Sequence, residues 1–217
     1  MIKREYKKLI QKNRDHCDSC TLVKEFCICN FVPIIDSDVK FILLTHSNEL
    51  KKRTNTGILI EKSMENTSII EWIRKEPSKE LLDIINSELQ VYILYPETDF
   101  VNTSKEESIV SNSLDRLDNK ESENTNKEKY IIILDGTWQE AQKMYNRSEY
   151  LKSIKRISLN PDSFSDYKLR RKKDDNHLCT VEAAIITLQM FDEEDNSDKL
   201  KIYFEKFQTN YKYSQSN

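Results

Sequence analysis

The chain has 217 residues, of which 37% are hydrophobic and 33% charged, and its formal net charge is −3 at pH 7. This length suits one substantial domain with a small appended module. No stretch approaches the ~20 apolar residues of a membrane span, and Met1–Tyr6 lacks the apolar core of a signal peptide. We therefore expect a cytoplasmic protein without a membrane partner; its oligomeric state stays open, with a monomer as one alternative.

The first 36 residues are predicted to form a module of their own. Residues 1–16 are a basic lead-in, and residues 17–30 contain four cysteines. Residues 37–217 contain the dense apolar runs that a core requires, and we expect them to form one α/β domain. Within it, residues 97–129 are rich in Ser, Asn, Glu and Lys, which predicts a flexible acidic insertion.

Strand and helix patterns alternate along this domain. Strands are predicted at about Val39–Thr45, Val91–Tyr95, Tyr130–Leu134 and Ile154–Leu159, whereas Ile69–Ile73 is ambiguous between strand and helix. Helices are predicted at Ile58–Met64, after Ser78, from Thr137 to Arg147, at Thr180–Phe191 and around Leu200–Phe207. This alternation predicts a mostly parallel sheet with helices on both faces.

Ligands bind sheets of this kind at the carboxyl ends of the strands. The residues that fall at these ends are His46, Pro96, Asp135 and Asn160. This position identifies candidate ligand-binding residues but does not indicate which ligand or reaction they serve.

Four cysteines, Cys17, Cys20, Cys27 and Cys29, lie within thirteen residues. In an intracellular protein such thiols bind metal more often than they form disulfides. Four soft ligands suit tetrahedral zinc and leave no open position for catalysis. The sequence therefore predicts a structural zinc, with free thiols, an oxidised pair or an iron–sulfur cluster as the alternatives.

The segment Asp135-Gly136-Thr137-Trp138 leaves a buried strand and enters a helix. A carboxylate there is partly desolvated, so it can accept a proton or pair with a cation. Thr137 can cap the helix, and Trp138 offers a flat face to an apolar or cationic group. The alternative is an N-capping turn with a packed tryptophan and no chemistry.

The chain has only two glycines, Gly57 and Gly136, which excludes the Gly-rich dinucleotide and phosphate loops. Each glycine either supplies a positive φ angle or lets the backbone approach a neighbour closely. Gly57 ends a polar segment that begins at His46 and includes Glu49, Arg53 and Asn55. Like other segments before a helix N-terminus, it is suited to phosphate or carboxylate.

A second polar segment leads from Tyr167 through Arg170 and Arg171 to the helix at Thr180. A local basic face favours phosphate binding more than the net charge does. Solvated surface lysines and arginines are the alternative. Cys179, at the start of the helix, is either a nucleophile or a small packing residue, and the packing interpretation is favoured.

In this order the motifs resemble those of the DTW-domain family. Its hallmark, Asp-x-Thr-Trp, is present at 135–138. The other matches are the leading cysteine cluster, Asn-Thr-Gly at 55–57 and a Leu-(Ser/Thr)-Thr-x-Glu-Ala segment at 178–183. Two departures are Cys179, where the family usually has Ser, and Asp174-Asp175 within the basic loop.

The resemblance implies a SPOUT-like, knotted α/β fold and the activity of a tRNA-uridine aminocarboxypropyltransferase. Such an enzyme moves the 3-amino-3-carboxypropyl group of S-adenosylmethionine to N3 of a tRNA uridine, giving acp3U and methylthioadenosine. Asp135 would be the catalytic residue, as general base or as orienting group. Cofactor contacts would come from Leu94, Asp135, Thr137, Trp138, Ala141, Leu159, Leu178, Cys179, Thr180 and Glu182.

For the tRNA partner, our candidate contacts are His46, Arg53, Asn55, Arg147, Arg170 and Arg171. The spacing of the motifs does not reveal which carbon of the donor faces the base. Two other functions are therefore kept open. One is a SPOUT-type S-adenosylmethionine-dependent RNA methyltransferase, and the other is a zinc-containing RNA-binding protein without catalysis.

Overall fold

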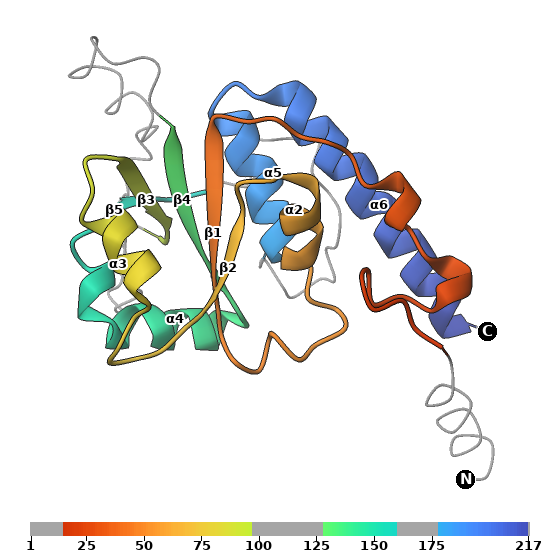
Figure 1. The fold of residues 1–217 in the computed structure, drawn as a ribbon, viewed down its shortest axis with the longest axis horizontal. Helices are drawn as coiled ribbons and strands as arrows, with labels where there is room; N and C mark the ends of the chain where they lie inside the picture. The colour runs from red at the N-terminus through yellow and green to blue at the C-terminus, as the bar shows by residue number, and fades with distance from the viewer. Residues whose placement is uncertain (1–14, 97–127, 160–177, 217) are drawn as a thin grey trace, which may run out of the picture.

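The computed structural model describes residues 15–96, 128–159 and 178–216, and a five-stranded sheet lies at its centre (Figure 1). All strand pairs are parallel, in the order β2-β1-β4-β3-β5. The predicted α/β class with a mostly parallel sheet is confirmed. The strands are β1 (Val39–Thr45), β2 (Ser68–Glu71), β3 (Gln90–Leu94), β4 (Lys129–Asp135) and β5 (Lys155–Ile157).

The central strands β1 and β4 pair in register from Val39 beside Lys129 to Thr45 beside Asp135. Every residue of β1 is buried, as expected for a parallel sheet covered on both faces. Both strands end at the same edge, where the His46 amide donates to the Asp135 carbonyl at 2.9 Å. The polar segments that follow the two strands therefore meet in the fold.

Helices cover the two faces of the sheet in two groups (Figure 1). α3 (Lys79–Ile85) and α4 (Trp138–Arg147) lie on one side, and α2 (Gly57–Ser63), α5 (Thr180–Met190) and α6 (Glu194–Ser216) lie on the other. Successive residues of a strand point to opposite faces, so β1 and β4 contribute alternately to two hydrophobic cores. The predicted helices on both faces are confirmed.

Several element boundaries differ from the sequence predictions, among them those of β2, β4 and β5. The ambiguous segment at 69–73 forms β2 as far as Glu71, and the Trp72 amide continues the pairing to the Thr45 carbonyl at 2.8 Å. β5 ends two residues before the predicted Leu159, and among the described strands its partner is β3 alone. β4 already begins at Lys129, which the acidic insertion was expected to include.

The cysteine segment, residues 15–31, packs against α6 (Figure 1). Leu22 is buried in the same core as Phe204 of α6, and Asn210 Nδ2 donates to the Phe26 carbonyl at 3.1 Å. A helix from the end of the chain thus holds a segment from its beginning. The predicted module boundary near residue 36 stays a prediction. The segment includes two short 3-10 helices, η1 (Lys24–Phe26) and η2 (Cys29–Phe31).

Several predictions concern residues outside the described part of the chain. These are the lead-in before residue 15, most of the insertion at 97–127, and Asn160, Arg170 and Arg171 in segment 160–177. A knot depends on the path of those segments, so the knotted SPOUT-like topology also stays a prediction. Of the helices that the structure describes, none has both the length and the apolar character needed to cross a bilayer.

Candidate functional site

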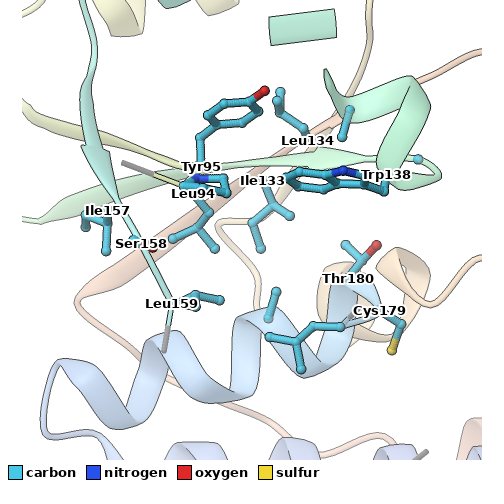
Figure 2. A pocket seen from close by; sticks show the side chains of 15 residues that line it. Leu94, Tyr95, Ile133, Leu134, Trp138, Ile157, Ser158, Leu159, Cys179 and Thr180 are labelled. Atoms are coloured by element: carbon cyan, nitrogen blue, oxygen red, sulfur yellow. The ribbon is translucent and has the colours of Figure 1, made fainter. Parts of the chain in front are cut away.

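A pocket of about 640 Å³ lies at the carboxyl ends of β3, β4 and β5, beside the start of α5 (Figure 2). Its volume is within the range of small-molecule sites, and its position is the one expected for a ligand site in a parallel sheet. Most of its wall is apolar. The residues that line it are Leu94, Tyr95, Pro96, Ile133, Leu134, Gly136, Trp138, Ala141, Ile157, Ser158, Leu159, Leu178, Cys179, Thr180 and Ala183.

The pocket brings together most of the predicted cofactor contacts, although they come from four separate parts of the sequence. Seven of the ten line its wall: Leu94, Trp138, Ala141, Leu159, Leu178, Cys179 and Thr180. The other three, Asp135, Thr137 and Glu182, are not part of the wall, but their hydrogen bonds hold lining residues or helix ends in place. Whether these residues bind a cofactor stays a prediction.

Asp135 is buried, with 2% of its surface exposed, and both of its carboxylate oxygens accept hydrogen bonds. Oδ1 accepts from Thr180 Oγ1 at 2.5 Å, and Oδ2 accepts from Asn55 Nδ2 at 3.0 Å. These two donors fix the carboxylate between the β1 loop and the first residue of α5. Thr180 lines the pocket and Asp135 does not. The Thr180 hydroxyl therefore connects the carboxylate to the pocket by a hydrogen bond.

Asn55 connects the loop after β1 to this carboxylate. Its Nδ2 also donates to the Glu49 carbonyl at 3.3 Å, and its Oδ1 accepts from the Gly57 amide at 2.7 Å. The side chain is therefore held on three sides and directed at Asp135. Its predicted contact with RNA stays a prediction.

Position 57 needs a glycine because neighbouring atoms leave no room for a side chain, and not because of its φ angle. Neither glycine of the chain has a positive φ, so that interpretation is wrong. A Cβ atom at Gly57 would lie 2.9 Å from Leu43 Cδ1 and 3.0 Å from Asn55 Oδ1. Contacts this short force a neighbour to move, and Asn55 is the neighbour that holds Asp135.

We expect Gly57→Ala to push against Leu43 first and Asn55 second, and to lower the unfolding free energy by about 1–3 kcal/mol, as overpacking typically does. Urea unfolding measures the loss. Leu43→Val shortens the side chain that the new methyl meets. In a double-mutant cycle, the double variant should therefore lose less stability than the sum of the two single losses. Simple additivity would show that the Leu43 contact is not the cause.

The Asp135 turn also contains a capping box. The Thr137 amide donates to Glu140 Oε2 at 2.8 Å, and the Glu140 amide donates to Thr137 Oγ1 at 3.3 Å, so the predicted cap of this helix is confirmed. Asn48 Nδ2 donates to Glu140 Oε1 at 3.1 Å. The Thr137 amide first, and then Asn48, lower the pKa of Glu140 from 4.5 to about 2.

The Glu140 carboxylate consequently stabilises the fold above pH 4.5, and this contribution is lost as the pH falls towards about 2. We expect Glu140→Gln to lower the unfolding free energy at pH 7 by about 1 kcal/mol, with a smaller difference from the wild type at pH 3. Urea unfolding at the two pH values measures both. Glu149→Gln, in the exposed start of η4 (Glu149–Leu151), is the matched control. A loss of equal size at both pH values would contradict the assignment.

His46 and Trp72 lie side by side at the edge of the same turn. Their rings stack with centroids 5.7 Å apart, and Trp72 Nε1 donates to Ser148 Oγ at 2.9 Å. His46 Nδ1 accepts from the Asn48 amide at 3.3 Å and lies 3.5 Å from Glu140 Oε1. The histidine is thus part of the network around the turn, and its contact with RNA stays a prediction.

Of the arginines predicted to contact RNA, the structure describes Arg53 and Arg147, and these two lie in different surroundings. Arg147 ends α4 and is exposed. Arg53 faces the cysteine segment, because its Nη1 lies 2.9 Å from His16 Nε2 and its carbonyl accepts from Thr21 Oγ1 at 2.7 Å. An RNA contact by Arg53 would have to share its guanidinium with His16.

Cys179 is the N-cap of α5, where its amide donates to Glu182 Oε2 at 2.8 Å. Glu182 is itself buried, with 4% of its surface exposed. Burial first, and the charge of Glu182 second, raise the pKa of the Cys179 thiol to about 12. A thiol that stays protonated at neutral pH is a poor nucleophile, so the packing interpretation of Cys179 is favoured.

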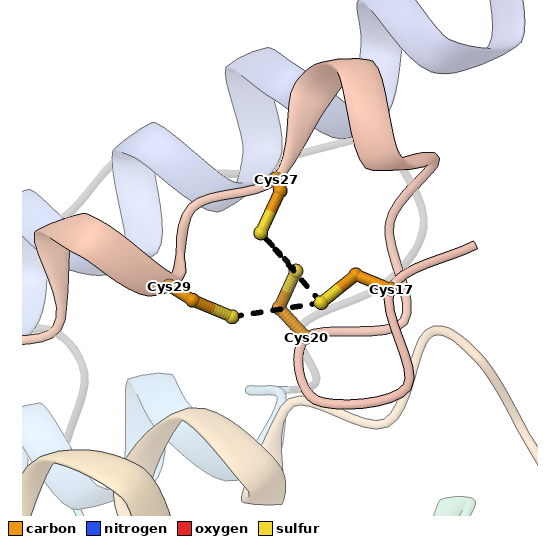
Figure 3. A group of neighbouring side chains, drawn as sticks. All are labelled: Cys17, Cys20, Cys27 and Cys29. Carbon is orange, nitrogen blue, oxygen red and sulfur yellow. Dashed lines mark hydrogen bonds between the residues drawn. The ribbon is translucent and has the colours of Figure 1, made fainter. Parts of the chain in front are cut away.

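The sulfur atoms of Cys17, Cys20, Cys27 and Cys29 converge within 4.8 Å of one another (Figure 3). The measured separations are 3.7 Å for Cys17–Cys29, 3.7 Å for Cys20–Cys27 and 3.6 Å for Cys17–Cys27. Tetrahedral zinc with Zn–S bonds of ~2.3 Å requires S···S distances of ~3.8 Å. The four residues therefore fit a zinc ion, in agreement with the sequence prediction.

The surroundings of the cysteines also suit a metal centre. The backbone amides of Cys20 and Ser19 lower the pKa of Cys17 to about 6, whereas the pKa values of Cys20 and Cys27 are raised, so in the absence of metal the cluster favours a single thiolate. Tyr203 of α6 is 2% exposed, and its hydroxyl has no hydrogen-bond partner in the described part of the chain. Burial, followed by the charge of the cysteines, raises the pKa of Tyr203.

A comparison with protein families identifies the family to which the cysteine, Asn-Thr-Gly and Asp-x-Thr-Trp motifs belong. Residues 14–212 match the family model of the DTW domain. The chain belongs to the DTW-domain family. The resemblance that the Asp-x-Thr-Trp, cysteine and Asn-Thr-Gly motifs indicate is thereby confirmed.

This DTW-domain chain is similar to several proteins whose names state an activity. It is 25% identical over 178 residues to tRNA-uridine aminocarboxypropyltransferase 2 of Drosophila melanogaster, covering 79% of this chain and 64% of the relative. The protein of the same name from Macaca fascicularis is 25% identical over 186 residues, 83% of this chain and 58% of the relative. It is 28% identical over 144 residues to tRNA-uridine aminocarboxypropyltransferase A of Arabidopsis thaliana, and this match covers 63% of this chain and 52% of the relative.

The chain therefore spans between about half and two thirds of the length of these DTW-domain relatives. No solved structure is significantly similar to it.

Pattern reasoning missed part of the pocket wall of this DTW domain. Ile133 and Leu134 end the apolar run directly before Asp135, a residue already placed at a strand end, so their position in the wall could have been predicted. Tyr95 could have been found, because it precedes Pro96, a residue already placed at a strand end. Ala183 could have been found as well, because it ends the motif at 178–183, whereas Ile157 and Ser158 carried no such signal.

Proposed function

We propose that this protein transfers the 3-amino-3-carboxypropyl group of S-adenosylmethionine to N3 of a uridine in tRNA. One observation carries the proposal: seven predicted cofactor contacts surround a single pocket whose wall is tied to Asp135. Family membership and the names of the relatives support it. The cysteine centre is proposed to hold a structural zinc, which leaves no position open for chemistry.

The pocket wall suits a donor with an adenine ring and a sulfonium. Trp138 stacks on Tyr95 with centroids 6.1 Å apart and an interplanar angle of 18°, and Tyr95 stacks on Tyr145 at 3.9 Å. Aromatic faces attract cations, and the leucines of the wall offer apolar contact to the adenine. Trp138 is held in place by this stack, so its position does not depend on the ligand.

In the proposed reaction the N3–H proton leaves, and N3 forms a bond to the methylene carbon γ to the donor's carboxylate. The C–S bond breaks, and its electron pair returns to sulfur, which leaves as neutral methylthioadenosine. Because Asp135 reaches the pocket through Thr180, we propose that Thr180 accepts the N3 proton and passes its own to Asp135 Oδ1. The uridine must be unpaired, since N3 takes part in Watson–Crick pairing.

Incubation with S-adenosylmethionine and unmodified tRNA tests this function. We expect methylthioadenosine in the supernatant and acp3U in the nucleoside digest of the tRNA. Adenosylhomocysteine with a methylated nucleoside would establish the methyltransferase alternative instead. Binding of tRNA that is indifferent to S-adenosylmethionine and gives neither product would identify an RNA-binding protein without catalysis.

A further inference from the structure

Thr21 has an unusual backbone conformation for its residue type. It lies between Cys20 and Leu22 in the tight turn of the cysteine segment, and its φ is 62°. β-Branched residues rarely adopt this left-handed region, which glycine and asparagine enter more easily. A threonine here indicates that its side chain has a task that offsets the strain.

The hydroxyl of Thr21 makes a long-range contact. Thr21 Oγ1 donates to the Arg53 carbonyl at 2.7 Å, across 32 positions of the sequence. The Arg53 guanidinium in turn approaches His16 of the cysteine segment, with Nη1 and Nε2 2.9 Å apart. Two contacts therefore join the cysteine segment to the loop of residues 49–57 that follows β1.

This loop holds the pocket carboxylate. Asn55, two residues after Arg53, donates from its backbone to the Lys52 carbonyl at 3.1 Å and from its side chain to Asp135 Oδ2 at 3.0 Å. Asp135 Oδ1 accepts from Thr180, which lines the pocket. A continuous series of contacts thus leads from the turn beside the metal ligands to the pocket wall.

We propose that Thr21 is a positioning residue whose hydroxyl fixes the loop of residues 49–57 and, through Asn55, the carboxylate of Asp135. The hydrogen bond lies at the surface, where such bonds add little to stability because water competes for them. Its expected effect is therefore on the position of the loop and not on the stability of the fold. The proposal deepens the proposed function, since it concerns the same site.

Three substitutions in the full chain separate these effects. Thr21→Val keeps the shape and removes the hydroxyl, Thr21→Ser keeps the hydroxyl, and Thr21→Gly removes the side chain together with the strain. We expect all three to keep one zinc per chain, and Thr21→Gly to unfold at the wild-type temperature or above it. In Thr21→Val and Thr21→Gly the hydrogen-bonded amides of residues 49–57 should exchange hydrogen several-fold faster. The Kd for S-adenosylmethionine should rise several-fold in both, and Thr21→Ser should behave as the wild type.

Wild-type exchange and affinity in Thr21→Val would overturn the proposal, and so would losses in Thr21→Ser as large as those in Thr21→Val. If Thr21→Gly loses its metal, the Val and Ser pair still decides the question. Failure of the proposed function is distinguishable, because it would appear as a wild type that makes no acp3U. Hydrogen exchange reports how often the loop opens, whether or not transfer occurs.

Discussion

Replacing Asp135 with asparagine is expected to lower the rate of acp3U formation by about 10²-fold or more, the usual contribution of a general base. The fold should persist because the shape is nearly unchanged. An amide can keep its oxygen towards Asn55 and turn its NH2 group towards Thr180, whose hydroxyl accepts as well as donates. Single-turnover assays measure the rate, with thermal unfolding and S-adenosylmethionine affinity as controls.

Two changes at Thr180 separate a direct role of Asp135 from an indirect one. If the carboxylate acts through the hydroxyl, Thr180→Val should lose as much activity as Asp135→Asn, and Thr180→Ser should keep most of it. Full activity in Thr180→Val with a large loss in Asp135→Asn would mean that Asp135 contacts the substrate directly. Undiminished activity in Asp135→Asn would remove the base and orienting roles together.

Replacing Cys17 with serine is expected to release the zinc and to cost about 3 kcal/mol or more of stability. For a chain of this length, that loss lowers the unfolding temperature by roughly 6–12 °C. The reason is that three remaining thiolates no longer saturate the tetrahedral ion, and the cysteine segment loses the cross-link between its own turns, which pack against α6. Metal analysis by mass spectrometry and a thermal melt measure the two effects.

The matched control is Cys179→Ser, which changes the fifth cysteine of the chain, outside the cluster. It should keep the full zinc content. A wild-type protein purified without chelators that contains no zinc would sink the assignment of the metal, and the cysteines would then be free thiols.

The sequence predicted best what local chemistry determines. The bounds of β1 and the capping residues Ser78 and Thr137 agree with the structure, because a run of apolar residues and a hydroxyl before a helix act within a few positions. The direction of the strands followed from their alternation with helices, and the location of the pocket followed from the direction of the strands.

Contacts between distant parts of the chain were beyond pattern reasoning. The RNA contact predicted for Asn55 stays a prediction, and no sequence pattern indicates the hydrogen bond from its amide to Asp135, 80 positions away. Thr21 carried no signal at all, because its φ angle and its bond to Arg53 exist only in the fold. Gly57 was recognised as informative, but the atoms that exclude a side chain there come from Leu43 and Asn55.

The stacking of Trp138 in the pocket wall has a practical consequence for spectroscopy. The chain contains two tryptophans, and the other, Trp72, stacks on His46 outside that wall. In a Trp72→Phe variant all indole fluorescence would arise from the pocket. Emission from Trp138 would then report when a ligand arrives and leaves, in real time and without a dye.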